Sequence, residues 1–548
     1  MRKLFTLLMA VVLSLTVFIV PGCGQSQKVD DTKSILNIGV MNAGVGIAWA
    51  EEAEKDFEAF YADTEFEEGK KGVDVIIDAK KDEFRANNLI LNMEHYDNAI
   101  YFIQESDYLG FINDGLIADI TDTVKEKVYD ANGDLAAATG KPAVKSILDT
   151  MDPELKSFYD VDGKYFGIPE STLVSGIFFD ADLFDENGYY FDAGGNLGAT
   201  QSHIDSGNIG KGPDGVQFTA DDGMPETFEQ FKELLRQMKT DGVVPFTWSG
   251  STIYQAKGAY QSVWANVEGY ENFNKNFTFS SDEKYDVANQ YGRKAGIEFF
   301  YEIAKGGEGG SGYYSPAAKN QDWLAAQFQF IDSINNPTGR IAFLLEGTWW
   351  EAESKKPFDD AAVEDPNMGY GKRDFRLFPI PNFPGQSDYS DYDTTVGRER
   401  EILVASEAMS KTSCTLSFIS EKNTCDKPEL QKELAKLFLQ FVQSREQLVK
   451  YTKNTGATLK PYEFEATKEE KAQWTKLAQN IYSYIEDGAK VSYNICTSEV
   501  ITGKYPFQNW SFNYDGGHEN PATLFINDNE NKLTVDDVYK QLIQNIRK

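Results

Sequence analysis

Two adjacent tryptophans, Trp349 and Trp350, end the apolar stretch "GRIAFLLEGTWWEAE". Consecutive side chains point to opposite sides of an extended backbone and diverge on a helix, so the two indoles cannot both be ordinary core residues. An indole offers a flat apolar face and one polar N–H, which suits it to contact a ligand as well as a core. We therefore expect one of these rings to face something other than the protein interior.

Residues for metal or nucleophilic catalysis are scarce. The chain has only three histidines, His95, His203 and His518, and they lie in different segments. A zinc hydrolase or a histidine-based triad has little to work with, and no CxxC pair, phosphate-binding GxxxxGK[ST] loop or GxGxxG turn after a strand is present. After Cys23, three cysteines remain, so at least one thiol is unpaired, and Cys414 and Cys425 are close enough in sequence to form a small disulfide loop.

A Gly- and Asp-rich segment, residues about 190–224, contains the only other candidate ligand set. Carboxylates separated by glycines are hard oxygen donors and could wrap a Ca²⁺ ion, although the order is not that of an EF-hand. The alternative is a solvated, turn-rich insertion, because Gly, Asp and Asn also dominate ordinary turns. The candidate calcium ligands are Asp205, Asp214, Asp221 and Asp222. We expect no other cofactor.

Composition indicates a folded, strongly acidic protein. The 548 residues are 41% hydrophobic and 25% charged, which is enough to bury two or more packed units. The net charge is −33, and it becomes −35 once the two positive charges of Arg2 and Lys3 are removed with the N-terminal segment. Such a surface repels phosphate, which argues against nucleic acid and against anionic lipid headgroups as direct ligands.

The N-terminus is typical of an export signal. A basic start precedes an apolar run from Leu4 to Val20, which stops at Pro-Gly before Cys23. A membrane-spanning helix is the alternative, but the run is at the short end of the ~17–25 residues that a span needs. The "VPGC" end resembles the lipobox of bacterial lipoproteins, with Val20-Pro21 as a departure. That resemblance implies a lipid on Cys23 and a polar tether after it.

The segments after the tether alternate between strand and helix patterns. "ILNIGV", "GVDVIIDA" and "DNAIYFI" are predicted strands, and a helix with Trp49 on its apolar face follows the first. This order predicts a parallel sheet, in which ligands bind beyond the carboxyl ends of the strands. Those ends are the loops that hold Gly44 to Trp49 and Gln104 to Asp107. Trp49 could equally pack in the core.

Two later helices are marked by their ends. Thr227 and Gln230 predict a capping box before an apolar stripe. A second helix is predicted from Pro428 to Gly456, because Pro favours the first turn and Gly follows the last.

Several stretches, in order, resemble the extracellular solute-binding proteins that deliver carbohydrates to ABC transporters, the family of maltose-binding protein. The stretches are "DGLIADITD", "DGKYFGIPESTLVSGIFFDADLFDENG", "PETFEQFKELLRQMKTDGVVPF", "GRIAFLLEGTWW" and "ELAKLFLQFVQSREQLVKYTKNTGATLKP". They cover most of the chain from Ile35 to about Pro461. The resemblance is weakest at the Gly/Asp-rich insertion and after Pro461.

The resemblance implies an α/β, periplasmic-binding-protein-like fold: two α/β lobes joined by crossing hinge strands, with a ligand cleft between them. The implied boundaries are a signal peptide (1–22), a tether (23–34), a first lobe (35–168 plus about 402–463) and a second lobe (about 176–398 plus 464–548). The Gly/Asp-rich insertion falls within the second lobe.

It also implies a sugar site. A pyranose has an apolar face and a rim of hydroxyls, so its site needs aromatic rings beneath and Asp, Glu, Asn or Gln around the edge. Trp349 falls on the family's stacking position, which leaves Trp350 to pack. Each further candidate also has a purely structural reading, as a surface loop, a hinge or a core residue. The other candidate ligand-binding residues are Glu170, Ser171, Asp107, Gln104, Trp248, Tyr254, Trp49, Gly46 and Trp510.

The function that this resemblance implies is binding without catalysis. A monomer, lipid-anchored at the extracellular face of the cell membrane, would capture a carbohydrate, expected to be an oligosaccharide, and pass it to ABC permease subunits. Two alternatives stay open. Plentiful Asp and Glu would allow a secreted glycoside hydrolase, which needs only two carboxylates ~5–9.5 Å apart. A binding protein for a polyamine, a peptide or another solute is the second.

Overall fold

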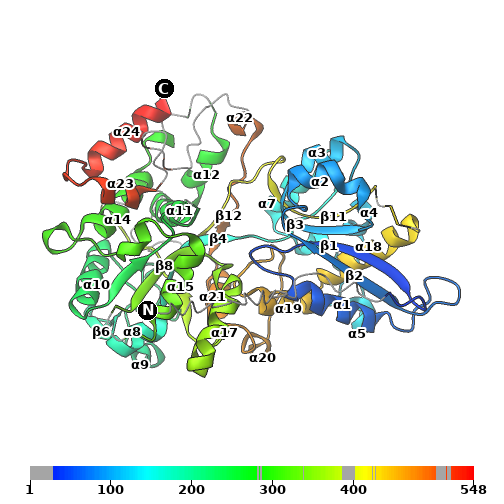
Figure 1. The fold of residues 1–548 in the computed structure, drawn as a ribbon, viewed down its shortest axis with the longest axis horizontal. Helices are drawn as coiled ribbons and strands as arrows, with labels where there is room; N and C mark the ends of the chain where they lie inside the picture. The colour runs from blue at the N-terminus through cyan, green and yellow to red at the C-terminus, as the bar shows by residue number, and fades with distance from the viewer. Residues whose placement is uncertain are drawn as a thin grey trace, which may run out of the picture.

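The protein folds into two lobes, each built on its own β-sheet (Figure 1). The structure is a computed structural model, and it describes residues 29–547 except 253, 281–282, 284–286, 337–338, 385–400, 423, 426, 502–511, 513 and 515–519. The first lobe lies on the right of Figure 1 and the second on the left. Two α/β lobes with crossing connections are the predicted fold class.

The first lobe has a four-stranded sheet in the order β11-β3-β1-β2. β1 pairs in parallel with both β2 and β3, so the predicted parallel strand-helix-strand pattern is confirmed, and β11 joins antiparallel to β3. The strands are β1 (Ser34–Met41), β2 (Val73–Lys80), β3 (Ile100–Ser106) and β11 (Cys414–Ile419). The helices are α1 (Ala48–Phe60), α2 (Ala86–Asn92), α3 (Tyr108–Asn113), α4 (Thr121–Lys125), α5 (Ala136–Thr139), α6 (Ile147–Thr150), α7 (Pro153–Tyr159), α18 (Pro428–Val442) and α19 (Arg445–Thr455).

The second lobe has a larger sheet in the order β12-β10-β4-β8-β7, with β9 added beside β4. Its strands are β4 (Val174–Asp180), β7 (Val244–Thr247), β8 (Ile341–Gly347), β9 (Phe375–Leu377), β10 (Ile402–Ala405) and β12 (Lys490–Ser492). Its helices are α8 (Ala181–Asn187), α10 (Phe228–Thr240), α11 (Tyr254–Glu268), α12 (Tyr270–Thr278), α14 (Tyr291–Lys305), α15 (Trp323–Ser333), α16 (Trp350–Glu353), α17 (Lys355–Glu364), α21 (Lys476–Glu486), α22 (Ser498–Ile501), α23 (Pro521–Asn527) and α24 (Val535–Arg547).

The second sheet is buried on both faces. Ile177 and Phe179 of β4 join one hydrophobic core with α10, α11 and α14, whereas Phe178 joins another with α15, α17 and α21. Successive strand residues face opposite sides, so an unbroken apolar run such as β8 is what two covered faces require. The first lobe has a separate core.

Three connections join the lobes: residues 168–174, 406–413 and 456–475, the last of which contains α20 (Lys468–Lys471). The resemblance implied that the chain re-enters the first lobe at about residue 402. This boundary is corrected, because β10 begins there and pairs with β4 and β12 in the second sheet. A short apolar strand carries no mark of the sheet it will join, so sequence alone could not place it.

The predicted capping box of Thr227 and Gln230 is confirmed at the start of α10. The single helix predicted from Pro428 to Gly456 is wrong in one respect, because it breaks into α18 and α19. Ser444 takes an extended conformation at the break, and its hydroxyl donates to Phe441 O. The break lets α19 turn and lie along α1.

The Gly/Asp-rich insertion forms ordered structure on the second lobe. It contains β5 (Tyr190–Phe191), β6 (Leu197–Ala199) and α9 (Gln201–Ser206). Phe191, Ile209 and Met224 are buried in the core of the lobe, so this segment is anchored by apolar contacts as well as by turns.

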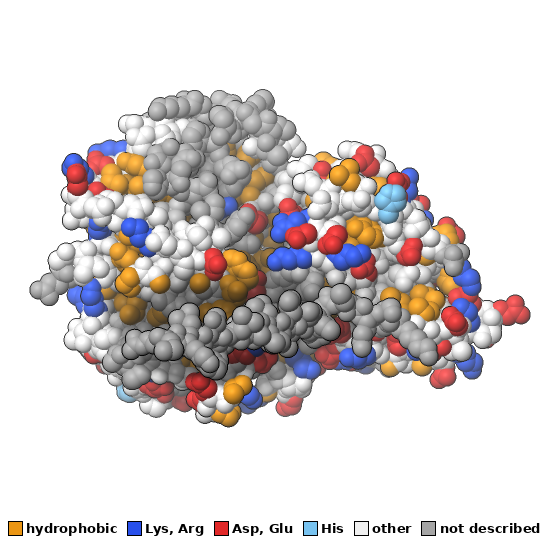
Figure 2. Space-filling model, in the orientation of Figure 1, with side chains coloured by type: hydrophobic (Ala, Val, Ile, Leu, Met, Phe, Trp, Pro, Cys, Tyr) orange, Lys and Arg blue, Asp and Glu red, His pale blue; other side chains and the backbone are white. Residues whose placement is uncertain are grey.

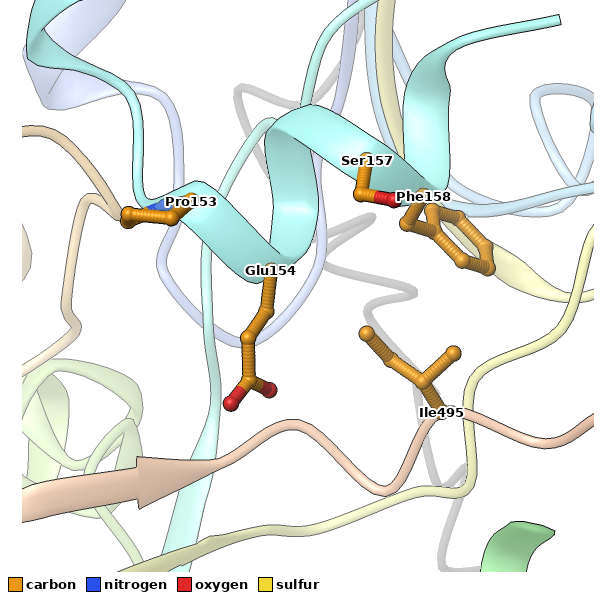
Figure 3. A pocket seen from close by; sticks show the side chains of 5 residues that line it. All are labelled: Pro153, Glu154, Ser157, Phe158 and Ile495. Carbon is orange, nitrogen blue, oxygen red and sulfur yellow. The ribbon is translucent and has the colours of Figure 1, made fainter.

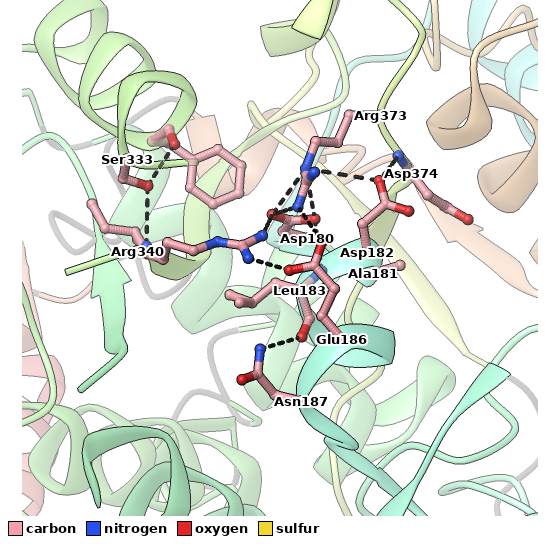
Figure 4. A network of polar contacts seen from close by, with 12 residues as sticks. Asp180, Ala181, Asp182, Leu183, Glu186, Asn187, Ser333, Arg340, Arg373 and Asp374 are labelled. Atoms are coloured by element: carbon pink, nitrogen blue, oxygen red, sulfur yellow. Dashed lines mark hydrogen bonds and ion pairs between the residues drawn. The ribbon is translucent and has the colours of Figure 1, made fainter. Parts of the chain in front are cut away.

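A buried carboxylate at the end of β4 is the centre of a polar network in the second lobe (Figure 4). Asp180 is fully buried and contacts Arg373 Nη2 at 2.8 Å and Arg340 Nη2 at 3.4 Å. Its other oxygen accepts from Leu183 N at the start of α8. The Asp180 carboxylate thereby pairs with both arginines and also caps the N-terminus of α8.

We expect Arg373→Met to lower the free energy of unfolding by about 2–3 kcal/mol, because the buried Asp180 carboxylate then keeps only the longer Arg340 contact as a counter-charge. Denaturant unfolding would measure it. Lys356→Met, which removes an exposed ion pair with Asp360, is the control and should change the value by less than about 0.5 kcal/mol. Equal effects of the two changes would contradict the expectation.

Cys414 and Cys425 form no disulfide, and Cys414 Sγ lies 3.4 Å from the Ser106 hydroxyl. Among the described residues, no helix is both long and apolar enough to cross a membrane.

Candidate functional site

The junction between the lobes lies where strands of both sheets end. In the second sheet, β8 lies beside β4 and ends at Gly347. In the first sheet, β1 lies beside β3 and ends at Met41. Gly44 and Trp349, which follow these two strands, approach each other across the lobes. The carboxyl ends of strands are where α/β sheets bind ligands.

Three residues from the two lobes meet at this junction. A β-carbon placed on Gly44, in the loop after β1, would lie 3.6 Å from Trp349 Cβ and 3.7 Å from Gln104 Oε1. Trp349 and Gln104 are both half-buried. The structure thus brings the indole of Trp349, from the second lobe, close to the side-chain amide of Gln104, from the first. Gly44 lies beside both and has no side chain.

The chain around Trp349 holds its ring in place. A β-carbon on Gly347 would lie 2.0 Å from two ring atoms of Trp349, so the indole lies directly over a residue that must have no side chain. Thr348 is tied to the first crossing connection, because its N–H donates to Val174 O at 2.8 Å and its Oγ1 accepts from Val174 N at 3.3 Å. Trp350 is fully buried among Phe330, Phe358 and Phe375, which confirms it as a packing residue.

A cluster of amides and carboxyl groups lies beside this turn. Glu346 Oε1 accepts from Gln255 Nε2 and Gln327 Nε2, both at 3.2 Å, and Gln327 Nε2 also donates to Glu353 at 3.0 Å. Burial raises the pKa of Glu353, and Lys81 of the first lobe opposes that rise from across the junction. Sequence reasoning missed this cluster; its one mark in the sequence is a lone Glu in the apolar strand "IAFLLEG".

The pKa of the Glu346 carboxyl is raised above its ordinary value. Burial raises its pKa to about 8, while hydrogen bonds from Gly347 N and from the two amides act in the opposite direction. Gln327 is 0% exposed and Gln255 is 5% exposed, and both bond to Glu346, so this cluster supports the turn before Trp349 from within the lobe.

A consequence is a specific pH dependence. The folded pKa of Glu346 lies above its unfolded value of ~4.3, so the folded state binds the extra proton and stability falls as pH rises from ~4.3 to about 8. We expect Glu346→Gln to lose this part of the decline, which melting curves between pH 5 and 9 would measure. Parallel curves for the two proteins would contradict the assignment, and the exposed Glu364→Gln is the control.

The first and third connections, which form the hinge between the lobes, are joined by a buried ion pair of Glu170 and Lys460. Glu170, a predicted ligand-binding residue, accepts from Lys460 Nζ at 2.9 Å and from Ser417 Oγ at 2.6 Å. Its carboxylate is therefore committed to joining the first and third connections with β11. Lys460 also lies over the ring of Tyr451 at 4.4 Å and that of Trp49 at 5.5 Å. Trp49 is buried and packs beside the ion pair of Glu170 and Lys460.

The other predicted site residues lie in several places. Gly46 forms a turn with φ of 68° in the loop beside Gly44. Ser171 lies at the hinge and its hydroxyl is buried without a hydrogen-bond partner. Asp107 caps α3 by accepting from Gly110 N at 2.8 Å, which explains its position without a ligand. Trp248 is fully buried against Tyr314, so no face of its ring is available for stacking, contrary to the prediction.

Three predicted residues cannot be placed by their side chains. Tyr254 begins α11, and its side chain lies outside the described part of the structure. Trp510 and the predicted lipidation site Cys23 also lie outside the described residues.

The predicted calcium site is not supported. Asp205 lies exposed on α9, and no group of three or more His, Cys, Asp or Glu within the described residues has a metal-binding arrangement. The remaining carboxylates bond to backbone N–H groups instead: Asp221 accepts from Asp214 N, Asp214 from Val216 N and Asp222 from Phe218 N. Turns of this kind need the same Asp and Gly residues as a calcium loop does.

Solved structures share this fold. The raffinose complex of the substrate-binding protein RafE is 14% identical, with a TM-score of 0.51, and the match covers 93% of this chain and 98% of that one. A protein solved in work on xylan utilization by the thermophilic bacterium Caldanaerobius polysaccharolyticus is 13% identical, with a TM-score of 0.51 and coverage of 93% and 100%. No family model and no curated protein matches the sequence. At these identities the likeness establishes the two-lobed solute-binding fold.

Proposed function

We propose that this protein captures a carbohydrate, an oligosaccharide, between its lobes and delivers it to an ABC importer without transforming it. The observation that carries the proposal is the meeting of Trp349 with Gly44 and Gln104 across the junction. The indole would stack on the apolar face of a sugar ring, and Gln104 would bond its hydroxyls. Two solved proteins of this fold, one with raffinose and one from work on xylan utilization, support the ligand class.

Capture would proceed by movement of the lobes about the three connections. Ligand that contacts both lobes selects the closed arrangement, because only there can it bond to Gln104 and stack on Trp349 at once. The closed arrangement would also form the surface that the permease subunits recognise.

Anchoring belongs to the same proposal. A lipid on Cys23, followed by the polar tether, would hold the monomer at the extracellular face of the cell membrane, within reach of its importer. The sequence of the first residues supports it, through the apolar run and the Gly-Cys that ends it.

One observation favours a second candidate, a glycoside hydrolase. Glu346 and Glu353 both bond to the same nitrogen of Gln327, and paired carboxyl groups are the machinery of glycoside cleavage. Against it, Glu346 is only 1% exposed and both its oxygens already accept hydrogen bonds. It has no access to a glycosidic oxygen.

The test uses the chain truncated after Cys23 and a panel of mono- and oligosaccharides, with spermidine and peptides included. Binding is followed by calorimetry, and the same mixtures are analysed for hydrolysis products. We expect saturable binding of at least one oligosaccharide with no product released. Release of hydrolysis products would show that the protein is a glycoside hydrolase and would contradict the proposal. Binding of a non-sugar solute without binding of any sugar would contradict the proposed ligand class.

A further inference from the structure

A large groove lies between the lobes along the third connection. Its cavity volume is about 1270 Å³. The first lobe contributes the start of α7, and the second contributes Tyr270, α21 and β12. β10 and β4 separate β12 from β8 in the second sheet, and Trp349, Gly44 and Gln104 do not line the groove, so the groove is distinct from the Trp349 junction. The residues already assigned to sugar binding do not line it.

The groove continues into a smaller cavity of about 470 Å³ that shares Pro153 and Glu154 with it. Figure 3 shows the Glu154 side chain pointing from α7 toward the strand β12, with Ile495 opposite Phe158. The Tyr270 hydroxyl donates to the Glu154 carboxylate. Residues of both lobes therefore meet in this space.

Tyrosine rings form much of the wall. Tyr270, Tyr462, Tyr482 and Tyr493 all line the groove. Two of these rings already interact with ammonium groups of the protein, because Lys490 Nζ lies 5.1 Å from the centre of Tyr270 and Lys471 Nζ lies 5.2 Å from that of Tyr482. The negative face of an aromatic ring attracts cations in this geometry.

Carboxylates outnumber the cations that line the same space. Asp152, Glu154 and Glu271 lie toward one end, and Glu463 and Glu465 follow the third connection. The lining lysines are Lys460 and Lys490. Lys460 is turned toward Glu170, which leaves Lys490 as the lining cation that can balance these carboxylates.

One wall residue has an unused polar group. Thr458 is 1% exposed, lines the groove, and its hydroxyl has no hydrogen-bond partner within the described structure. A buried hydroxyl without a partner costs free energy, so a ligand that donates a hydrogen bond to it would gain by doing so. An ammonium group is such a donor.

We propose that this groove binds an organic cation with more than one amino group, such as a linear polyamine, as a site separate from the sugar site. Ammonium groups would bond to the carboxylates and to the Thr458 hydroxyl, and the methylene chain would lie against the tyrosine rings. Because both lobes line the groove, an occupant that binds one arrangement of the lobes better than another must also change the affinity at Trp349. The proposal holds whichever solute binds at Trp349.

The test is a calorimetric titration of the chain truncated after Cys23 with spermidine at near-physiological salt. A net charge of −33 attracts any polycation diffusely, so matched variants decide the outcome. We expect Glu154→Gln to weaken binding about tenfold and Thr458→Val several-fold, since each removes one acceptor of an ammonium hydrogen bond. Glu469→Gln, an equal loss of charge on α20 outside the groove, should leave it unchanged.

Trp349→Ala should also leave spermidine binding unchanged, which separates this proposal from the sugar site. The melting temperatures of Glu154→Gln and Thr458→Val establish that both are folded before binding is compared. Absence of saturable binding to the wild-type protein would overturn the proposal. So would equal weakening by Glu469→Gln and Glu154→Gln, because diffuse attraction would then explain the binding.

Discussion

Lys460→Met is expected to lower the free energy of unfolding by about 3–5 kcal/mol, because it leaves the Glu170 carboxylate buried without a counter-charge. The side chains of Lys460 and Glu170 are 1% and 4% exposed, and the pair links two of the three connections between the lobes. Burial raises the pKa of Glu170 in spite of Lys460. Denaturant unfolding at neutral pH measures the change.

Two further variants make this prediction specific. Glu170→Gln combined with Lys460→Met should recover much of the loss, since no buried charge then remains unpaired. Lys453→Met, which removes a partly exposed ion pair with Glu52, should cost less than about 1 kcal/mol. If Lys460→Met were as mild as Lys453→Met, the hinge would not depend on this pair.

The second large effect is expected at Trp350. Trp350→Ala should lower the free energy of unfolding by about 3–5 kcal/mol, because it empties a site enclosed by Phe330, Phe358 and Phe375. Trp350→Phe should cost much less, since the Trp350 indole N–H is buried without a partner and its loss removes no hydrogen bond. Thermal and denaturant unfolding measure both.

The neighbouring Trp349→Ala is the matched control for stability. Its ring is only half-buried over Gly347, so its loss should cost clearly less than that of Trp350. A reversal of this order would mean that the two rings had exchanged the packing and ligand roles given to them here.

Local patterns predicted the parts of the fold that depend on neighbouring residues. The apolar runs of β1, β2 and β3 and the helix between the first two predicted a parallel sheet, and the structure has one. The capping box at the start of α10 joins Thr227 and Gln230, which are three positions apart. Such features are set by backbone periodicity and by short-range hydrogen bonds.

Features that depend on distant partners could not be predicted. Glu170 looks like a ligand residue until Lys460, which is 290 positions away, is found against it. Asp107 follows a strand, where a ligand residue would stand, yet the same position serves as the cap of α3. Trp248 follows a strand too, but Tyr314 and the surrounding core cover it.

The central claim is that a sugar stacks on Trp349 as the lobes close, and one measurement tests it most directly. Intrinsic tryptophan fluorescence of the chain truncated after Cys23 is recorded during titration with the best oligosaccharide, for the wild-type protein and for Trp349→Ala. We predict a saturable change in the wild type and a loss of affinity of about 1–3 kcal/mol or more in the variant, with a similar melting curve. Unchanged affinity in a folded Trp349→Ala protein would contradict the account.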